Sequence, residues 1–277
     1  MDIVRITTGL ILAGVTLCVF AFAPFTVVYS YAAVVGLLGL WEWIKLSGIQ
    51  GLGYQLIATA VIAVSIYMLE LLANQQAAIG LAILLSVSVF WLVAFFLVLR
   101  YPVSAKLWRH RLPLKLFAGF IVFAGLWFGT LYLLAQPLDR YLILVVVSLV
   151  AFADTGAYFA GRRFGKRKLS PKVSPGKSWE GLVGGVILST LIGVLLAAFV
   201  LNAQSPIWLG LLLSVPVALV SVVGDLTESM LKREAGCKDS SRLIPGHGGV
   251  LDRIDALVAG VPVFACVHFL ATSLAAS

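Results

Sequence analysis

One predicted helix near the C-terminal end carries polar side chains on a single face. These side chains are Asp225, Glu228, Ser229 and Lys232. Residues spaced by three, four and seven positions lie on the same side of an α-helix. Asp225 falls inside an apolar run, where a charged group is costly and therefore marks a candidate functional site; the alternative is an aspartate neutralised by a structural partner. The stripe predicts a polar site at the end of this helix.

A second group of carboxylates follows a glycine pair further along the chain. Gly248 and Gly249 permit a tight bend or a close approach of the backbone to a ligand. Asp252 and Asp255 then share one face at the start of the last predicted helix. Carboxylates without a Cys or His cluster suit a hard cation such as Mg²⁺ rather than Zn²⁺. We therefore predict that both bind Mg²⁺ together with Asp225.

Basic side chains flank these carboxylates in the sequence. They are Lys177, Lys232, Arg233 and Lys238. Carboxylates alone would repel a phosphorylated substrate, whereas carboxylates that hold a divalent cation beside lysine and arginine would attract one. This combination is typical of phosphoryl or nucleotidyl transfer, in which positioning and charge stabilisation supply most of the catalysis. His247, in the same loop, could orient a carboxylate, contact a phosphate or cap the turn, and these three roles stay open.

The segment before the seventh apolar run offers a further position for a phosphate. Ser178 is placed to cap a helix that has Glu180 in its first turn. A helix N-terminus beside a lysine, here Lys177, is a good binding site for an anion. Gly176-Lys177-Ser178 resembles the end of a P-loop, but that motif requires glycine where Pro171 stands, and we expect no strand before it. We therefore exclude a P-loop NTPase.

The elements that carry these residues are predicted to lie in a membrane. The sequence is 61% hydrophobic and only 12% charged, whereas a soluble domain is about 45–50% apolar. Apolar runs of about 17–25 residues span a bilayer as helices. Nine such runs are present, at residues 6–23, 25–44, 54–73, 78–99, 114–135, 140–160, 182–201, 207–231 and 254–274. We expect an all-α polytopic membrane protein whose first run is retained, because Pro24 is expected to block cleavage there.

Basic residues predict the orientation of these nine spans. With nine spans, all of the 20 lysine and arginine residues except Arg140 fall on one side. The positive-inside rule makes that side the cytoplasm. The N-terminus is then cytoplasmic and the C-terminus lies outside. We expect a protein of the cell (inner) membrane whose polar site faces the cytoplasm.

The chain divides into two regions of different character. Residues 1–99 are predicted to form four spans with short connections, and residues 100–277 to form a catalytic region with long, basic cytoplasmic loops. These loops are residues 100–115, 161–181 and 232–253. Glu42 and Glu70 in the first region lie near the ends of spans, and we interpret both as interfacial anchors.

The stretch from Ser229 to Asp255 resembles the signature of the phosphatidate cytidylyltransferase family, also called CDP-diacylglycerol synthases. It reads S-x-L-K-R-x4-K-D-x-S-x2-I-P-x-H-G-G-x-x-D-R-x-D, without a departure from the family pattern. Three upstream segments are also similar to the family: Asp154 to Lys166, Ser174 to Gly181, and Gly224-Asp225. The resemblance implies an integral membrane enzyme of glycerophospholipid synthesis, with dimers expected.

The resemblance also implies a reaction. The phosphate of phosphatidate attacks the α-phosphorus of CTP, and CDP-diacylglycerol and pyrophosphate form. Mg²⁺ is implied, and a second cation is left open. The expected partners are therefore CTP, phosphatidate, membrane lipids and a second copy of the chain, and no nucleic acid is expected.

Carried over by position, the resemblance assigns roles to individual residues. Asp225, Asp252 and Asp255 would ligate the metal, and Lys232 would be the fourth catalytic residue. Asp154 would support the site. The residues expected to contact phosphates or otherwise bind substrate are Lys177, Ser178, Ser229, Arg233, Lys238, His247, Gly248, Gly249 and Arg253.

Two other functions fit parts of this pattern. A transferase that acts on polyprenyl phosphate or another lipid phosphate would use the same metal and basic residues. An anionic-lipid transporter is the second alternative. Transporters often show two related halves and a site near the membrane midplane, whereas no halves are visible here and the charges crowd one interface. Pyrophosphate release measured with a panel of nucleotides distinguishes the first alternative from a CTP-dependent enzyme. Transport of an anionic lipid in liposomes without any reaction would support the second.

Overall fold

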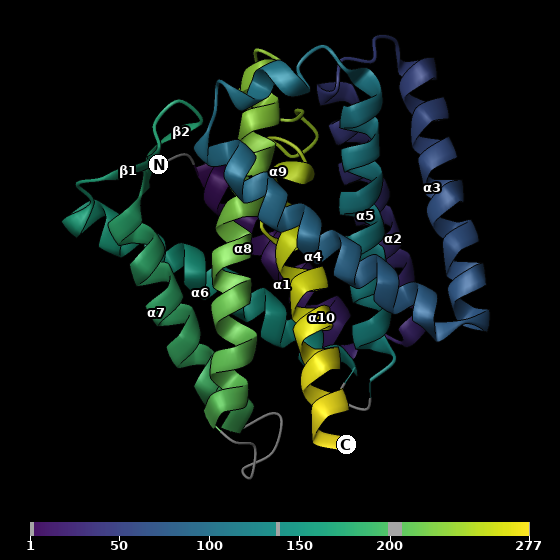
Figure 1. The fold of residues 1–277 in the computed structure, drawn as a ribbon, viewed down its shortest axis with the longest axis vertical. Coiled ribbons are helices and arrows are strands. Elements are labelled where there is room, and N and C mark those ends of the chain that lie inside the picture. Colours follow the sequence, from purple (N-terminus) through teal and green to yellow (C-terminus); the bar gives the residue numbers. More distant parts are fainter. Residues whose placement is uncertain (1–2, 137–138, 199–206, 277) are drawn as a thin grey trace.

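Long helices account for most of the computed structural model (Figure 1), which describes residues 3–136, 139–198 and 207–276. The long helices are α1 (Ile3–Phe22), α2 (Phe25–Leu46), α3 (Leu52–Gln75), α4 (Ala77–Leu99), α5 (Leu112–Leu134), α6 (Asp139–Phe164), α7 (Trp179–Leu196), α8 (Ile207–Glu234) and α10 (Leu257–Ala276). The shorter elements are the 3₁₀ helix η1 (Ser104–Leu107), the strands β1 (Lys168–Ser170) and β2 (Ser174–Ser178), and α9 (Leu251–Ile254).

Eight helical segments of the described chain are long and apolar enough to cross a membrane, and the last of them, Leu251–Ser273, includes α9 and most of α10. The first helix contributes a shorter apolar stretch, Thr7–Phe22. Many large apolar side chains, such as Phe96 and Ile187, point outward, which is unfavourable in water and favourable in lipid. These findings confirm an all-α polytopic membrane fold, while the count of nine spans and the orientation of the termini stay predictions.

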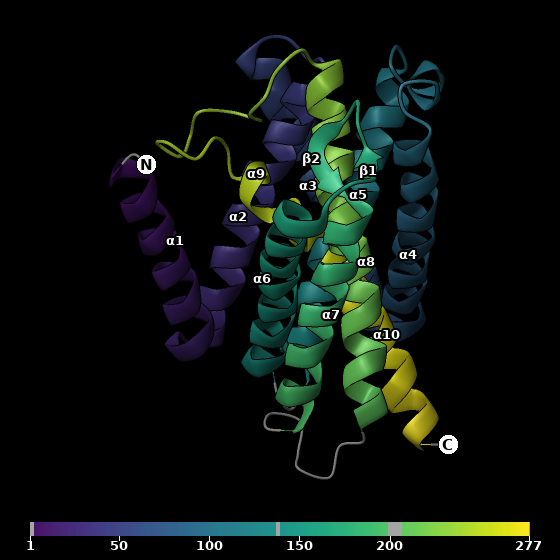
Figure 2. The same cartoon turned by 90° about the vertical axis from the view of Figure 1, so that its left-hand side faces the viewer.

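The basic connections gather at one end of the helix bundle. In both views the loop between α4 and α5, the two strands and α9 lie at the end where α1 begins, whereas α10 ends at the opposite end (Figures 1 and 2). The helices beside the predicted loops extend beyond the apolar runs into polar sequence, and the division of the chain into two regions stays a prediction. The connections at this end are residues 47–51, 100–111, 165–178 and 235–250.

A short β-hairpin connects α6 to α7, although the sequence predicts no strand there. β1 and β2 pair in antiparallel fashion. Leu169 and Val173 of this hairpin are buried in a cluster with side chains of α4 and α8, so the burial of apolar side chains stabilises strands in a turn-like sequence. A strand therefore does precede Pro171, and the exclusion of a P-loop rests on Pro171 itself. The hairpin places the residues at its end beside α8.

Small residues bring α6 and α7 into close contact next to Asp154. A Cβ atom at Gly185 would lie 2.6 Å from the carbonyl oxygen of Ala153, and a Cβ at Gly181 would lie 2.9 Å from that of Ala157. Gly181 and Gly185 thus form a G-x-x-x-G pair that allows two membrane helices to approach closely. The packing fixes the position of α6 relative to its neighbours.

Candidate active site

A polar cavity of about 400 Å³ collects most of the predicted site residues. Its lining side chains come from α6, α8, the loop 235–250, α9 and the residue that follows α9. They are Asp154, Asp225, Ser229, Lys232, Arg233, Lys238, Asp239, Asp252, Arg253 and Asp255. All of them except Asp239 are predicted from the sequence. The cavity therefore combines carboxylates with cationic side chains in one place.

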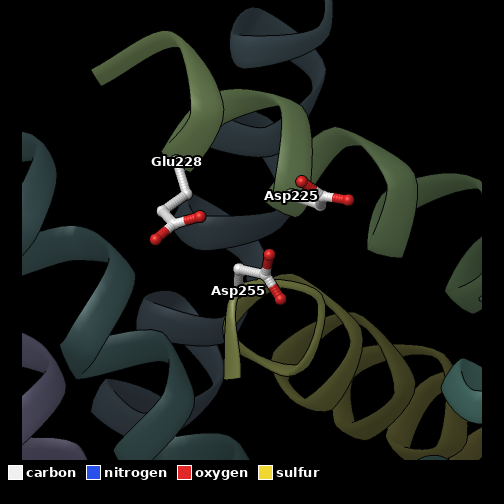
Figure 3. A group of neighbouring side chains, drawn as sticks. All are labelled: Asp225, Glu228 and Asp255. Carbon is white, nitrogen blue, oxygen red and sulfur yellow. The ribbon is translucent and has the colours of Figure 1, made fainter. Parts of the chain in front are cut away.

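Three carboxylates in and beside this cavity are close enough to share one cation. Asp225 and Glu228 lie on α8, Asp255 follows α9, and each offers an oxygen within 4.8 Å of the others (Figure 3). Carboxylate oxygens are the ligands of hard cations such as Mg²⁺. Among the described residues, Glu228 Oε1 is buried and accepts no hydrogen bond, which leaves it available to a cation. The side chains present therefore fit a divalent hard cation.

Gly224 allows these carboxylates to meet. It precedes Asp225 on α8 and faces the break between α9 and α10. A Cβ atom at Gly224 would overlap the carbonyl oxygen of Asp255 and would lie 3.0 Å from the Cβ of Ala259. Only glycine lets the two backbones approach this closely. The Gly224-Asp225 pair thus has a direct structural reason: the glycine brings the aspartate to its partner carboxylate.

Asp252 does not join the group of three. The sequence predicts one helix face for Asp252 and Asp255, but α9 ends one residue before Asp255, which lies in the break before α10. The Asp252 carboxylate instead pairs with Lys232 Nζ at 2.6 Å. It also accepts the backbone N–H groups of Ser240 (2.9 Å) and Gly249 (2.7 Å). Its contacts are those of a residue that holds the loop, and its role as a metal ligand stays a prediction.

Lys232 connects the two acidic groups. Its Nζ lies 2.6 Å from Glu228 Oε2 and 2.6 Å from Asp252 Oδ1. The Lys232 side chain is 11% exposed, and those of Glu228 and Asp252 are 1% and 6% exposed. The Lys232 ammonium stabilises these two buried carboxylates, because loss of one partner from a buried ion pair is strongly destabilising. Lys232 therefore supports the site even before any phosphate is bound.

The β1–β2 hairpin delivers a second lysine to this region. Lys177 Nζ lies 2.5 Å from Asp225 Oδ2, and Ser229 Oγ donates a hydrogen bond to Asp225 Oδ1 (3.2 Å). Arg233 Nε donates to the carbonyl oxygen of Val173 (3.2 Å), which ties the end of α8 to the hairpin. Asp225 thus has a cationic and a hydroxyl neighbour, each from the predicted set.

Five predicted site residues of the described structure do not line the cavity: Lys177, Ser178, His247, Gly248 and Gly249. Ser178 caps α7 by accepting the N–H of Gly181 (3.1 Å), which confirms the predicted cap. Gly248 has φ = 85°, a left-handed conformation that favours glycine. The imidazole of His247 lies against α1, because a Cβ atom at Gly9 would be 3.2 Å from its Nε2. Contact of these residues with substrate stays a prediction.

Glu42 of α2 is a residue of this region that the sequence interpretation missed. It is not an interfacial anchor, because its side chain is fully buried and its carboxylate accepts hydrogen bonds from the loop 235–250 and α9. One signal was available, since a carboxylate inside an apolar span is a functional candidate by default. The sequence did not reveal the hydrogen-bond partners of Glu42, because Ser240 lies 198 positions further along the chain than Glu42.

The similarity of this chain to known proteins extends beyond the C-terminal signature. Residues 3–271 match the model of the cytidylyltransferase family. A phosphatidate cytidylyltransferase of Pseudomonas aeruginosa is 43% identical over 96% of this chain and 97% of its own length. Proteins of the same name from Haemophilus influenzae and Staphylococcus haemolyticus are 39% and 31% identical; they cover 96% and 92% of this chain, and 98% and 90% of their own lengths. The similarity therefore extends over the N-terminal helices as well as the C-terminal signature.

Proposed function

This chain belongs to the cytidylyltransferase family, as the signature predicted, and we propose from this premise that it is an integral membrane enzyme that converts CTP and phosphatidate to CDP-diacylglycerol and pyrophosphate. Relatives similar over nearly the whole chain bear the name of this activity. The observation that carries the proposal is the polar cavity, in which carboxylates suited to a divalent cation lie beside lysine and arginine side chains.

The proposed reaction joins a phosphate oxygen of phosphatidate to the α-phosphorus of CTP. The bond between the α-phosphorus and the oxygen that bridges it to the β-phosphorus breaks, and its electron pair leaves with pyrophosphate. Both reactants are anionic, so their repulsion must be offset and their reacting atoms aligned. The cationic side chains that line the cavity are Lys232, Arg233, Lys238 and Arg253. They are placed to contact phosphates of either reactant.

Asp225, Glu228 and Asp255 would hold a divalent cation such as Mg²⁺. When bound, the cation would neutralise phosphate charge, including the charge that develops on the leaving pyrophosphate. Lys232 stabilises the carboxylate of Glu228 through their ion pair. Lys177, which contacts Asp225, is placed to contact a substrate phosphate at the edge of the cavity.

The proposed location is the cell (inner) membrane, with the cavity facing the cytoplasm. The positive-inside rule assigns the end with the basic loops to that side. CTP is soluble and phosphatidate lies in the leaflet, so a cavity lined by α6, the end of α8 and α9 can reach both. A homodimer is also part of the proposal, and the family resemblance alone supports it.

The proposed function is tested with the purified full chain in detergent micelles that contain phosphatidate. CDP-diacylglycerol formation and pyrophosphate release are measured with CTP and, for comparison, with ATP, GTP and UTP. We expect both products with CTP and neither in the absence of phosphatidate. Release that is indifferent to CTP, or that requires polyprenyl phosphate instead, would contradict the proposal. Anionic-lipid transport in liposomes without product would favour the transporter.

Removal of divalent cations is expected to abolish turnover. Excess EDTA should lower product formation by about a hundredfold or more, because metal coordination supplies several kcal/mol of charge stabilisation in such reactions. Added Mg²⁺ should restore the rate. EDTA that is saturated with Mg²⁺ beforehand serves as the control. A full rate in dialysed protein with EDTA would show that the carboxylates do not act through a cation.

The loop between α4 and α5 is expected to matter little for turnover. Arg109 pairs with Glu234 at the end of α8, and Tyr101 donates a hydrogen bond to the same carboxylate (2.9 Å). Burial, and then this hydrogen bond, raise the pKa of Tyr101. Arg109 does not line the polar cavity, so Arg109→Ala should keep the rate within about twofold of wild type in the same assay. A large loss would mean that the loop belongs to the site.

A further inference from the structure

The Glu42 carboxylate on α2 holds the segment that carries the C-terminal carboxylates. Oε2 accepts the hydroxyl of Ser240 (2.9 Å) and the N–H of Leu251 (2.6 Å), and Oε1 accepts the hydroxyl of Ser241 (2.6 Å) and the N–H of Val250 (3.0 Å). Two of these donors lie within the loop 235–250, one is its last residue, and one is the first residue of α9. One side chain from an N-terminal helix thus fixes both the loop and α9.

Hydrogen bonds alone compensate the charge of Glu42. Its side chain is fully buried, and none of the described lysine or arginine residues forms an ion pair with it. Two of its donors are backbone N–H groups at the start of α9, which would otherwise be unsatisfied at a helix N-terminus. Hydrogen bonds to a carboxylate are stronger than those between neutral groups. Glu42 therefore acts as an N-terminal cap that is supplied by another helix.

The same network extends from Glu42 to the group of three carboxylates. Ser240 Oγ lies 2.9 Å from Glu42 Oε2 and 2.8 Å from Asp252 Oδ2. Asp252 in turn pairs with Lys232, and Lys232 pairs with Glu228. Each step is a direct contact between buried or nearly buried groups. A shift of Glu42 would therefore move α9, and with it Asp252 and the adjoining Asp255.

Gly249 makes room for this network. A Cβ atom at Gly249 would overlap the hydroxyl of Ser240 and both carboxylate oxygens of Glu42. The second glycine of the pair thus permits a close approach, as the sequence predicts, but the group that approaches is a carboxylate of the protein itself. This packing leaves little freedom for the Glu42 side chain.

We propose that Glu42 is a positioning residue for the proposed cytidylyl transfer: it caps α9 from α2 and so sets the position of Asp255 relative to Asp225 and Glu228. The inference rests on the proposed function for its catalytic meaning and on the hydrogen bonds above for its structure. It assigns part of the site to the N-terminal region, which the sequence divides from the catalytic region.

The test compares Glu42→Gln with wild type in the full chain. Glutamine has the same size but loses the charge and one acceptor oxygen, so α9 should be held less firmly. Mn²⁺ binding, followed by electron paramagnetic resonance, should weaken by about fivefold or more, as expected for the loss of a charged hydrogen bond. In the CTP assay, kcat should fall by about tenfold, with the KM for CTP within about twofold of wild type.

A second measurement does not depend on activity. Cys237 lies in the loop 235–250, and burial raises the pKa of its thiol, so N-ethylmaleimide should react slowly with it in wild type. In Glu42→Gln, we expect Cys237 alkylation, followed by peptide mass spectrometry, to be about fivefold faster or more because the loop opens more often. A chain that lacks cytidylyl transfer but shows these shifts would refute the proposed function and support this inference.

Glu70→Gln is the matched control. Glu70 is another carboxylate of the N-terminal helices, and it accepts a hydrogen bond from Trp127 Nε1 (2.8 Å) away from the cavity. The Glu70→Gln substitution should leave Mn²⁺ binding, kcat and Cys237 alkylation unchanged. For Glu42→Gln, unchanged Mn²⁺ binding would overturn the inference, even with faster alkylation, because Glu42 would then be a structural residue only.

A second variant decides the matter if Glu42→Gln does not fold. Ser241→Ala removes one donor to Glu42 and also an acceptor for the N–H of Leu243 (3.1 Å). Mn²⁺ binding should weaken by about twofold to fivefold, and Cys237 alkylation should rise by a similar factor. Wild-type Mn²⁺ binding by folded Ser241→Ala would overturn the inference.

Discussion

Asp225→Asn is expected to lower cytidylyl transfer by about a thousandfold or more, because several kcal/mol of charge stabilisation depend on the cation that Asp225 would hold. Asparagine keeps the size of the side chain and removes its charge. Asp225 is the member of the group of three that also contacts Lys177 and Ser229, so the substitution disturbs both the cation and the nearby lysine. CDP-diacylglycerol formation at saturating CTP and Mg²⁺ measures the effect.

Folding must be separated from chemistry in this experiment. Asp225→Asn should elute as a monodisperse species and should melt close to wild type, because its surroundings are polar. Glu70→Gln, which changes a carboxylate outside the cavity, should keep the wild-type rate. Near-wild-type turnover in Asp225→Asn would show that the assignment of the cation to these carboxylates is wrong.

Lys232→Met is expected to abolish turnover and to destabilise the protein. Methionine fills similar space but leaves the carboxylates of Glu228 and Asp252 without the ammonium that lies 2.6 Å from each. Loss of one partner from a buried ion pair costs about 3–5 kcal/mol, because the remaining charge is left uncompensated. Thermal denaturation in detergent and the CTP assay measure the two effects. Lys106→Met, at an exposed lysine of η1, is the control and should change neither.

A double-mutant cycle tests the reason for this effect. If Lys232→Met destabilises by leaving Asp252 unpaired, the addition of Asp252→Asn should recover part of the lost stability. The two substitutions would then be clearly non-additive, as is usual for residues in one ion-pair network. Additive losses in the melting experiments would mean that the contact between Lys232 and Asp252 contributes little. Asp252→Asn alone is expected to abolish turnover through the loss of Lys232 positioning.

Most residues of the cavity could be predicted from the sequence because their signal is local. Asp225, Ser229 and Lys232 follow helical spacing within one segment, and that spacing survives in α8. A charged residue at the end of an apolar run is an equally local signal. Lys177 and Ser178 were also found beside a helix start, although the hairpin that positions Lys177 was not expected.

Local sequence does not decide whether Glu228 or Asp252 lies beside Asp225 and Asp255. Both residues lie three positions from a member of the pair, so spacing gives no preference. The structure groups Glu228 with the pair because α9 ends before Asp255, and the Asp252 carboxylate is taken up by Lys232 and backbone N–H groups. A break of two residues between the short α9 and the long α10 leaves no clear mark in hydropathy.

By itself, the sequence determined the membrane environment, the side on which basic residues gather and the polar stripe of α8, because hydropathy, charge and helical period act over neighbouring residues. Only the tertiary structure decided which carboxylates meet and that Glu42 of α2 caps α9. These contacts join residues that are far apart in the chain, and they depend on how closely Gly224 and Gly249 let separate segments approach.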